Sequence, residues 1–194
     1  MKGCRPLNEE EVERTLACFA GPHANRDRAL FLLGVKSGFR ISELLSLQLR
    51  DVMPRGKLVE RVTVPRRHMK KKLEGRTVLL HPDAKGVLCA WLEELREAGY
   101  MTSDVYVFQS RKGRNRALSR VQAYRILQNV FERAGLHGSL GTHSMRKTFA
   151  NRVYERLDKD LLKTQRALGH RNINSTVSYL SFREEDIDEA ILGM

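Results

Sequence analysis

Apolar residues recur at helical spacing along most of this chain. The first helical pattern follows Asn8, which together with Glu11 three positions later predicts a capping box. A second pattern covers residues 24–37 and stops at Gly38, a residue typical of a helix end. A third helix is expected to start at Ser42 and run toward position 51. The residues between the second and third helices should therefore form a tight turn, which can hold one side chain rigidly.

An alternating, β-branched pattern replaces the helical one in residues 57–65 and 76–80. Two short strands so close together predict a hairpin. Helical spacing returns in residues 82–99, where Cys89 is expected in the core, and in residues 119–135. The pattern as a whole predicts an α+β fold that is mostly helical with a small antiparallel sheet.

The length of 194 residues suits one sizeable domain. Its 35 Lys and Arg residues outnumber its 23 Asp and Glu residues, so the formal charge is +12. This excess favours a polyanionic partner such as a nucleic acid, although ribosomal and membrane-surface proteins share it. The three cysteines are widely spaced, which argues against a disulfide framework or a zinc site. No apolar run reaches the ~20 residues of a membrane span, so a cytoplasmic location is expected.

The positive charge is concentrated in two segments. One lies between the two predicted strands, and the other lies in the loop ahead of position 119. Because Lys and Arg contacts to phosphate supply much of the affinity of proteins for DNA, both segments are candidate DNA-binding surfaces. For any single residue a solvated loop is the alternative. The candidates are Arg66, Arg67, Lys71 and Lys72 in the first segment, and Arg111, Lys112, Arg114, Arg116 and Arg120 in the second.

Residues 139–180 hold side chains that suit a phosphate-handling site. His143 and Arg146 are three positions apart, so they share a face if the segment is helical, and both side chains bind phosphate well. Taken alone, such a pair is more often a solvated helix face. Its weight comes from the residues that follow it.

A second histidine and a tyrosine lie further along this segment. Gly169 predicts the end of a helix directly before His170. Tyr179 follows nine positions later, in a short run for which Ser175 is the expected N-cap. Separately, His170 could be a cation at a helix C-terminus and Tyr179 a core residue. Their order and spacing favour a shared function.

Two motifs in this order resemble the tyrosine recombinases of the phage integrase family. The segment G-F-R-I-S-E-L is similar to the family's first arginine box, and T-H-S-M-R-K-T-F-A followed by L-G-H-R-N-I is similar to its C-terminal signature. The resemblance covers roughly residues 8–182 and implies the catalytic-domain fold of that family, with residues 1–194 forming a single catalytic domain. Residues 21–24 and 168–173 are also similar to the short fimbrial phase-switch recombinases. The chain is therefore expected to be either such a short enzyme or a fragment of a longer integrase.

The resemblance implies site-specific DNA recombination by strand cleavage and rejoining, without a metal and without a cofactor. The nucleophile would be a tyrosine that forms a 3′-phosphotyrosine, and its phenol, with an ordinary pKa near 10, needs nearby cations. Two arginines would bind the scissile phosphate, two histidines would complete the site, and a lysine at the hairpin tip would protonate the departing 5′-oxygen. The implied catalytic residues are Arg40, Lys70, His143, Arg146, His170 and Tyr179, with Glu43 in support and with Lys71 and Lys72 as alternatives to Lys70.

The implied partner is double-stranded DNA, bound by a homotetramer on paired sites. A monomer is expected in the absence of DNA, and no membrane association is expected. Residues 182–194 would form a C-terminal tail that docks on a neighbouring protomer. The alternatives are a type IB topoisomerase-like enzyme and a non-catalytic DNA-binding regulator that keeps the fold. Such a regulator would be marked by the loss of a site residue, and none is missing here.

Overall fold

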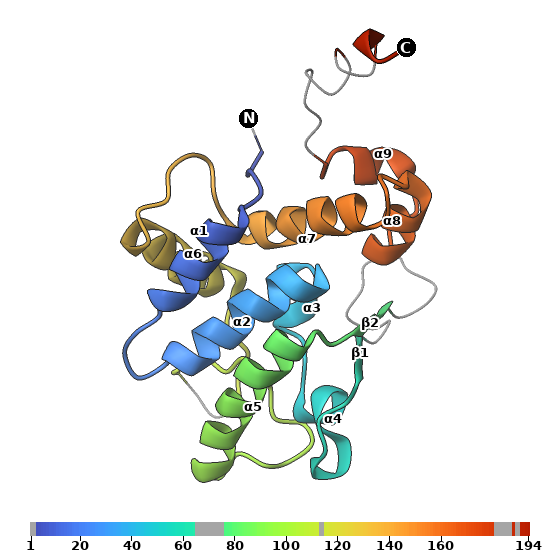
Figure 1. The fold of residues 1–194 in the computed structure, drawn as a ribbon. Helices are drawn as coiled ribbons and strands as arrows, with labels where there is room; N and C mark the ends of the chain where they lie inside the picture. The colour runs from blue at the N-terminus through green and yellow to red at the C-terminus, as the bar shows by residue number, and fades with distance from the viewer. Residues whose placement is uncertain (1–2, 65–75, 113–114, 181–187, 189–190) are drawn as a thin grey trace. The chain divides into compact units, whose positions relative to one another are not determined.

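The computed structural model describes residues 3–64, 76–112, 115–180, 188 and 191–194. It divides into two compact units, Met1–Phe149 and Ala150–Met194, and each is described by itself (Figure 1). The first unit contains α1 (Glu9–Ala17), α2 (Ala24–Ser37), α3 (Ile41–Leu44), α4 (Leu49–Val52), the 3₁₀ helix η1 (Pro54–Gly56), β1 (Arg61–Val64), β2 (Arg76–Leu79), α5 (Pro82–Glu97) and α6 (Arg120–Arg133). Helix α7 (Thr142–Arg156) contains the boundary, and the second unit continues with α8 (Leu161–Leu168) and α9 (Ile173–Val177).

The predicted fold class is confirmed, because helices dominate and β1 and β2 form a two-stranded antiparallel sheet. Val64 pairs with Arg76 in this sheet, and Val62 and Val64 are fully buried while the alternate residues Arg61 and Thr63 are exposed. The prediction of a single domain over residues 1–194 stays a prediction, and most of the proposed tail lies outside the described residues.

The first two helices begin and end where their sequence signals lie. The Asn8 side chain accepts a hydrogen bond from the Glu11 backbone N–H at 2.8 Å, and the Glu11 carboxylate accepts one from the Asn8 N–H at 3.0 Å. Helix α2 has the predicted bounds, and Gly38 ends it with a φ of 59°. Both signals act within one helical turn, so the sequence is sufficient to place them.

The predicted long helix from Ser42 is wrong. Helix α3 is only four residues long, and Arg40, rather than Ser42, is its N-cap. The chain is extended at Gln48 before α4 begins, because Gln48 forms a β-bridge with Tyr106 and the Leu49 N–H donates to the Val105 carbonyl at 2.8 Å. A distant extended segment thus interrupts a pattern that looks continuous in the sequence.

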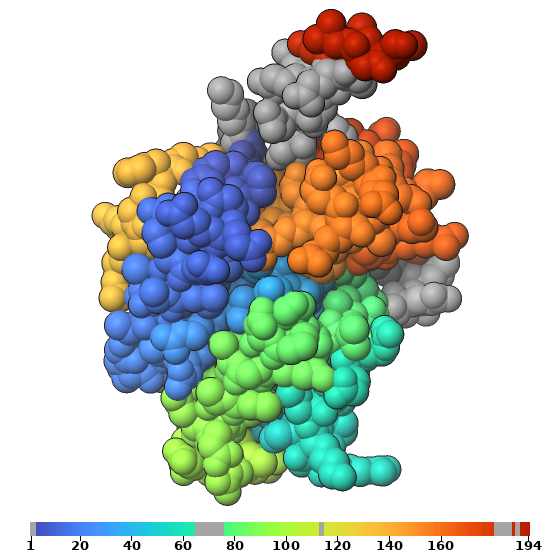
Figure 2. All heavy atoms as spheres, viewed as in Figure 1, coloured from blue at the N-terminus to red at the C-terminus, as the bar shows by residue number. Residues whose placement is uncertain are grey.

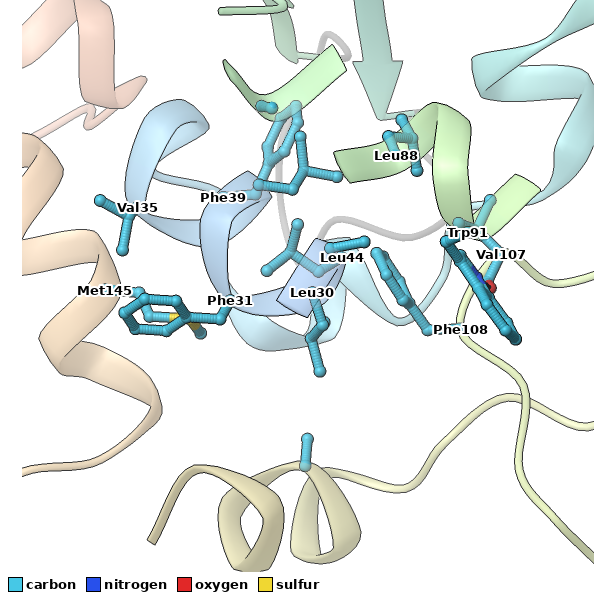
Figure 3. Packing of buried hydrophobic residues seen from close by; sticks show 14 of the residues in the cluster. Leu30, Phe31, Val35, Phe39, Leu44, Leu88, Trp91, Val107, Phe108 and Met145 are labelled. Atoms are coloured by element: carbon cyan, nitrogen blue, oxygen red, sulfur yellow. Dashed lines mark hydrogen bonds between the residues drawn. The ribbon is translucent and has the colours of Figure 1, made fainter. Parts of the chain in front are cut away.

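Helix α2 is the centre of the first unit's core. Its residues Leu30 and Phe31 are fully buried, and Figure 3 shows them between the aromatic side chains of Trp91 and Phe108 on one side and Met145 on the other. The Trp91 indole N–H donates to a buried backbone carbonyl at 2.7 Å, so its polar atom is satisfied. Helix α2 packs along α5, and their side chains form a continuous surface in Figure 2.

Cys89 is exposed, so its predicted place in the core is wrong. The buried face of α5 is made by Leu88, Trp91, Leu92 and Leu95, which follow the helical period. Position 89 lies off that face. Within the described ranges, no helix is both long and apolar enough to cross a membrane.

Candidate active site

Arg40 is held at both ends by Glu43. The Arg40 backbone N–H donates to Glu43 Oε2 at 2.8 Å, and Arg40 Nη1 donates to Glu43 Oε1 at 3.0 Å. The Glu43 side chain is 3% exposed and that of Arg40 is 35% exposed. The carboxylate therefore anchors the guanidinium from inside while part of the cation faces outward, an arrangement that is preorganised for an anion.

Arg146 comes to the same turn from α7, where His143 also lies, so the segment is helical, as a shared face for the two side chains requires. The Arg146 side chain is 1% exposed, and its Nη1 donates to the carbonyl oxygen of Gly38, 108 positions away in the sequence. Since Gly38 is two residues before Arg40, both arginines are attached to the turn between α2 and α3.

Gly38 is required at this turn for two reasons. Its φ of 59° is unfavourable for other residues, and a Cβ there would overlap the ring of Phe149. We expect Gly38→Ala to lower the free energy of unfolding by about 2–5 kcal/mol, from ~1–2 for the left-handed backbone and ~1–3 for overpacking.

Gly135→Ala is the matched control for this change. Gly135 follows α6 with a φ of 65°, and among the described residues no atom beyond its chain neighbours lies within 4 Å of a Cβ built there. Only the backbone cost of about 1–2 kcal/mol applies to it. Urea denaturation of both variants measures the difference. If the two variants lose the same free energy of unfolding, the Phe149 ring can move aside at little cost.

His143 lies in positive surroundings. Its pKa is lowered, first by partial burial of the imidazole and then by the charges of Arg146, Arg40 and Lys147. Each of these disfavours the imidazolium form. At neutral pH the ring is therefore uncharged and able to accept a proton.

We expect the NMR titration of His143 to show a pKa below the ordinary 6.5. Lys147→Gln removes one of the cations that oppose protonation, so it should raise this pKa, whereas Lys147→Arg keeps the charge and should leave it in place. A wild-type midpoint at or above the ordinary value would contradict the assignment of a neutral ring.

The second unit places His170 against Tyr179. Their ring centroids are 5.2 Å apart with an interplanar angle of 53°. His170 Nδ1 lies 3.0 Å from the hydroxyl of the buried Thr176, and the Tyr179 carbonyl accepts a hydrogen bond from Asn151 Nδ2 at 3.1 Å. The imidazole orientation and the backbone of the tyrosine are thus both fixed.

The local structure around this pair matches one prediction and corrects another. Gly169 ends α8 with a φ of 61°, as predicted. Ser175 is not an N-cap, because Asn172 caps α9 by accepting from the Asn174 N–H at 2.9 Å. The helix therefore starts earlier, and Tyr179 follows its C-cap.

Part of the second basic segment surrounds a hollow of about 330 Å³ in the first unit. Arg111, Lys112 and Arg116 line it together with the buried Arg26, and the exposed Arg120 begins α6 next to it. The other candidates, Arg66, Arg67, Lys70, Lys71, Lys72 and Arg114, lie outside the described residues.

Residues that hold the site in place were missed in the sequence. Arg76 contacts the turn that carries Arg40, and Gln165 Nε2 donates to the carbonyls of His170 and Arg171, both at 3.1 Å. The only sequence signal for Arg76 is a cation at the start of an otherwise apolar strand. In the part of the chain that is described, no group of three His, Cys, Asp or Glu residues is placed to hold a metal ion.

The sequence from residue 5 to residue 185 matches the model of the phage integrase family, and the chain belongs to that family. It is 33% identical over 160 residues to the probable integrase/recombinase YoeC of Bacillus subtilis (strain 168), which covers 82% of this chain and 80% of that protein. It is also 33% identical over 174 residues to the type 1 fimbriae regulatory protein FimB of Escherichia coli (strain K12), covering 89% and 82%.

Solved structures agree with this assignment. The XerH site-specific recombinase bound to its palindromic difH substrate superimposes with a TM-score of 0.75 at 28% identity, over 96% of this chain and 51% of that chain. The XerA recombinase gives a TM-score of 0.78 at 21% identity, over 100% of this chain and 64% of that chain. This chain thus spans about half of XerH. Fold and motifs together define a tyrosine recombinase catalytic domain. Enzymes of this class carry out site-specific DNA recombination.

Proposed function

We propose that this chain cleaves and rejoins DNA at specific sites through a covalent bond between Tyr179 and a DNA 3′-phosphate. The observation that carries the proposal is the attachment of Arg40 and Arg146 to one turn, from segments more than a hundred positions apart. Negative charge grows on the non-bridging oxygens of a phosphate under attack, and guanidinium groups donate to such oxygens in bidentate geometry. Two anchored guanidinium groups meet that requirement without a metal.

In the proposed cleavage step, the phenolic oxygen of Tyr179 attacks phosphorus and the bond from phosphorus to the 5′-oxygen breaks. The phenolic proton passes to the neutral imidazole of His143, whose lowered pKa supports this role. The departing 5′-oxygen takes a proton from a lysine, for which we propose Lys70, with Lys71 and Lys72 as alternatives. His170 supports the phosphate by donating a hydrogen bond.

Rejoining is the reverse reaction. A 5′-hydroxyl attacks the phosphotyrosine, the bond from phosphorus to the phenolic oxygen breaks, and the phenol regains a proton. Because the phosphotyrosine linkage keeps the energy of the broken bond, no ATP is required. If the attacking hydroxyl belongs to another DNA strand, the result is strand exchange.

The partner we propose is double-stranded DNA in the cytoplasm. The formal charge of +12 and the basic residues around the hollow next to α6 support phosphate contacts. The XerH relative was solved in complex with its difH substrate, which supports DNA as the partner here too. We further propose that four protomers act on two paired sites and that residues 182–194 dock on a neighbouring protomer.

The proposal is tested by covalent trapping. The protein is incubated with nicked DNA that carries the candidate junction. The short strand between the cleavage site and the nick, which carries the released 5′-hydroxyl, diffuses away after cleavage, so rejoining cannot occur. After denaturation, a DNA-linked protein band is expected. A non-catalytic regulator would bind the DNA and give no band, whereas a topoisomerase-like enzyme would give a band on DNA of unrelated sequence.

A further inference from the structure

Arg76 is a buried cation at the start of an otherwise apolar strand. It opens β2, pairs with the fully buried Val64 and is itself 7% exposed. Burial of a charge is costly unless the charge is fully engaged. A buried arginine at this position is therefore expected to have specific partners.

The Arg76 guanidinium is engaged by the end of α2. Its Nη2 donates to the Ser37 carbonyl at 2.8 Å and its Nη1 donates to the Gly38 carbonyl at 3.0 Å. The last carbonyls of a helix have no partner within the helix and carry partial negative charge, so a cation is favourable there. Two consecutive carbonyls match the planar fork of arginine, which lysine does not have.

The Gly38 carbonyl accepts from two arginines. Arg146 Nη1 donates to the same oxygen as Arg76 Nη1. The guanidinium of Arg76 also lies 5.0 Å from the ring centre of Phe39 and 5.9 Å from that of Phe149. The oxygen to which Arg146 is attached is therefore held in turn by Arg76.

The charges agree with this arrangement. Burial, and after it the charge of Arg146, lowers the pKa of Arg76 to about 9, while Glu43 opposes the shift. Arg76 thus remains a cation at neutral pH. Both of its Nη atoms donate to backbone carbonyls at the end of α2, which suits a supporting role.

We propose that Arg76 is a positioning residue that holds Arg146 in its phosphate-binding orientation through the shared Gly38 carbonyl. This inference rests on the proposed function for its catalytic consequence, but the coupling of the two arginines is measurable without DNA. The alternative is that Arg76 only stabilises the end of α2.

The decisive variant is Arg76→Lys, which keeps the charge and removes the fork. Arg61→Lys is the matched control, since Arg61 is an exposed arginine of the same hairpin. In the wild type, the Arg146 Nε–H is expected to give a distinct NMR signal with slow solvent exchange. In Arg76→Lys this exchange should accelerate by about tenfold or more, and in Arg61→Lys it should not change. An unchanged Arg146 signal in folded Arg76→Lys would overturn the proposal.

A double-mutant cycle in the trapping assay gives the catalytic test. Arg76→Lys is expected to slow covalent cleavage by about tenfold in the wild-type background and by less than about threefold when Arg146→Lys is already present, because the two act as a unit. Equal losses in both backgrounds would indicate a merely structural role. If the wild type forms no adduct, the proposed function fails, and the NMR result still decides the coupling. If Arg76→Lys does not fold, the same coupling is measured in the reverse direction. The Arg146→Lys variant should then accelerate the solvent exchange of the Arg76 Nε–H signal.

Discussion

Tyr179→Phe is expected to abolish the covalent adduct with nicked DNA, a loss of about 10⁴-fold or more in cleavage. The substitution removes one oxygen atom, and this oxygen is the one proposed to bond to phosphorus. The ring stays, so the packing against His170, with centroids 5.2 Å apart, should be kept. The hydrogen bond from Asn151 reaches the backbone carbonyl and is equally unaffected. Binding to the same DNA, measured by fluorescence anisotropy, should therefore change little.

Tyr100→Phe is the control for this experiment. Tyr100 is also exposed in part, at 37%, and the chemical change is identical. Adduct formation should remain at the wild-type level. If Tyr179→Phe still forms an adduct, another residue is the nucleophile, and mass spectrometry of the trapped peptide would identify it.

Arg146→Lys is expected to slow covalent cleavage by about 10²–10³-fold, the range found for the loss of one preorganised donor to a developing oxyanion. The positive charge remains, but the planar fork is lost, and with it the ability to bind Gly38 and a phosphate oxygen at once. DNA affinity should fall much less, since most of it comes from other phosphate contacts. Single-turnover cleavage at saturating protein separates the two effects.

Arg156→Lys is the matched control on the same helix, because Arg156 is an exposed residue of the last turn of α7. It should cleave at the wild-type rate. An Arg146→Lys enzyme within about threefold of wild type would mean that the charge alone suffices and that bidentate donation from this residue is not needed. Thermal unfolding of both variants checks that the comparison is made between folded proteins.

Local signals in the sequence determined much of this protein. The capping box at Asn8, the bounds of α2 and the glycine ends at Gly38 and Gly169 were predictable because each depends on residues within one helical turn. The family was predictable as well, since the order of the arginine, histidine and tyrosine motifs resembles one family, and family membership is confirmed.

The tertiary structure decided what depends on residues far apart in the chain. The bridge between Gln48 and Tyr106 divides a predicted helix into α3 and α4, and no sequence pattern near Gln48 predicts this bridge. Arg76 looked like the first residue of a strand, yet it shares the Gly38 carbonyl with Arg146. Helix caps are contacts between residues close in the sequence, so the local sequence specifies them. The partners of a buried guanidinium come from distant segments, so they are determined only by the tertiary packing of the chain.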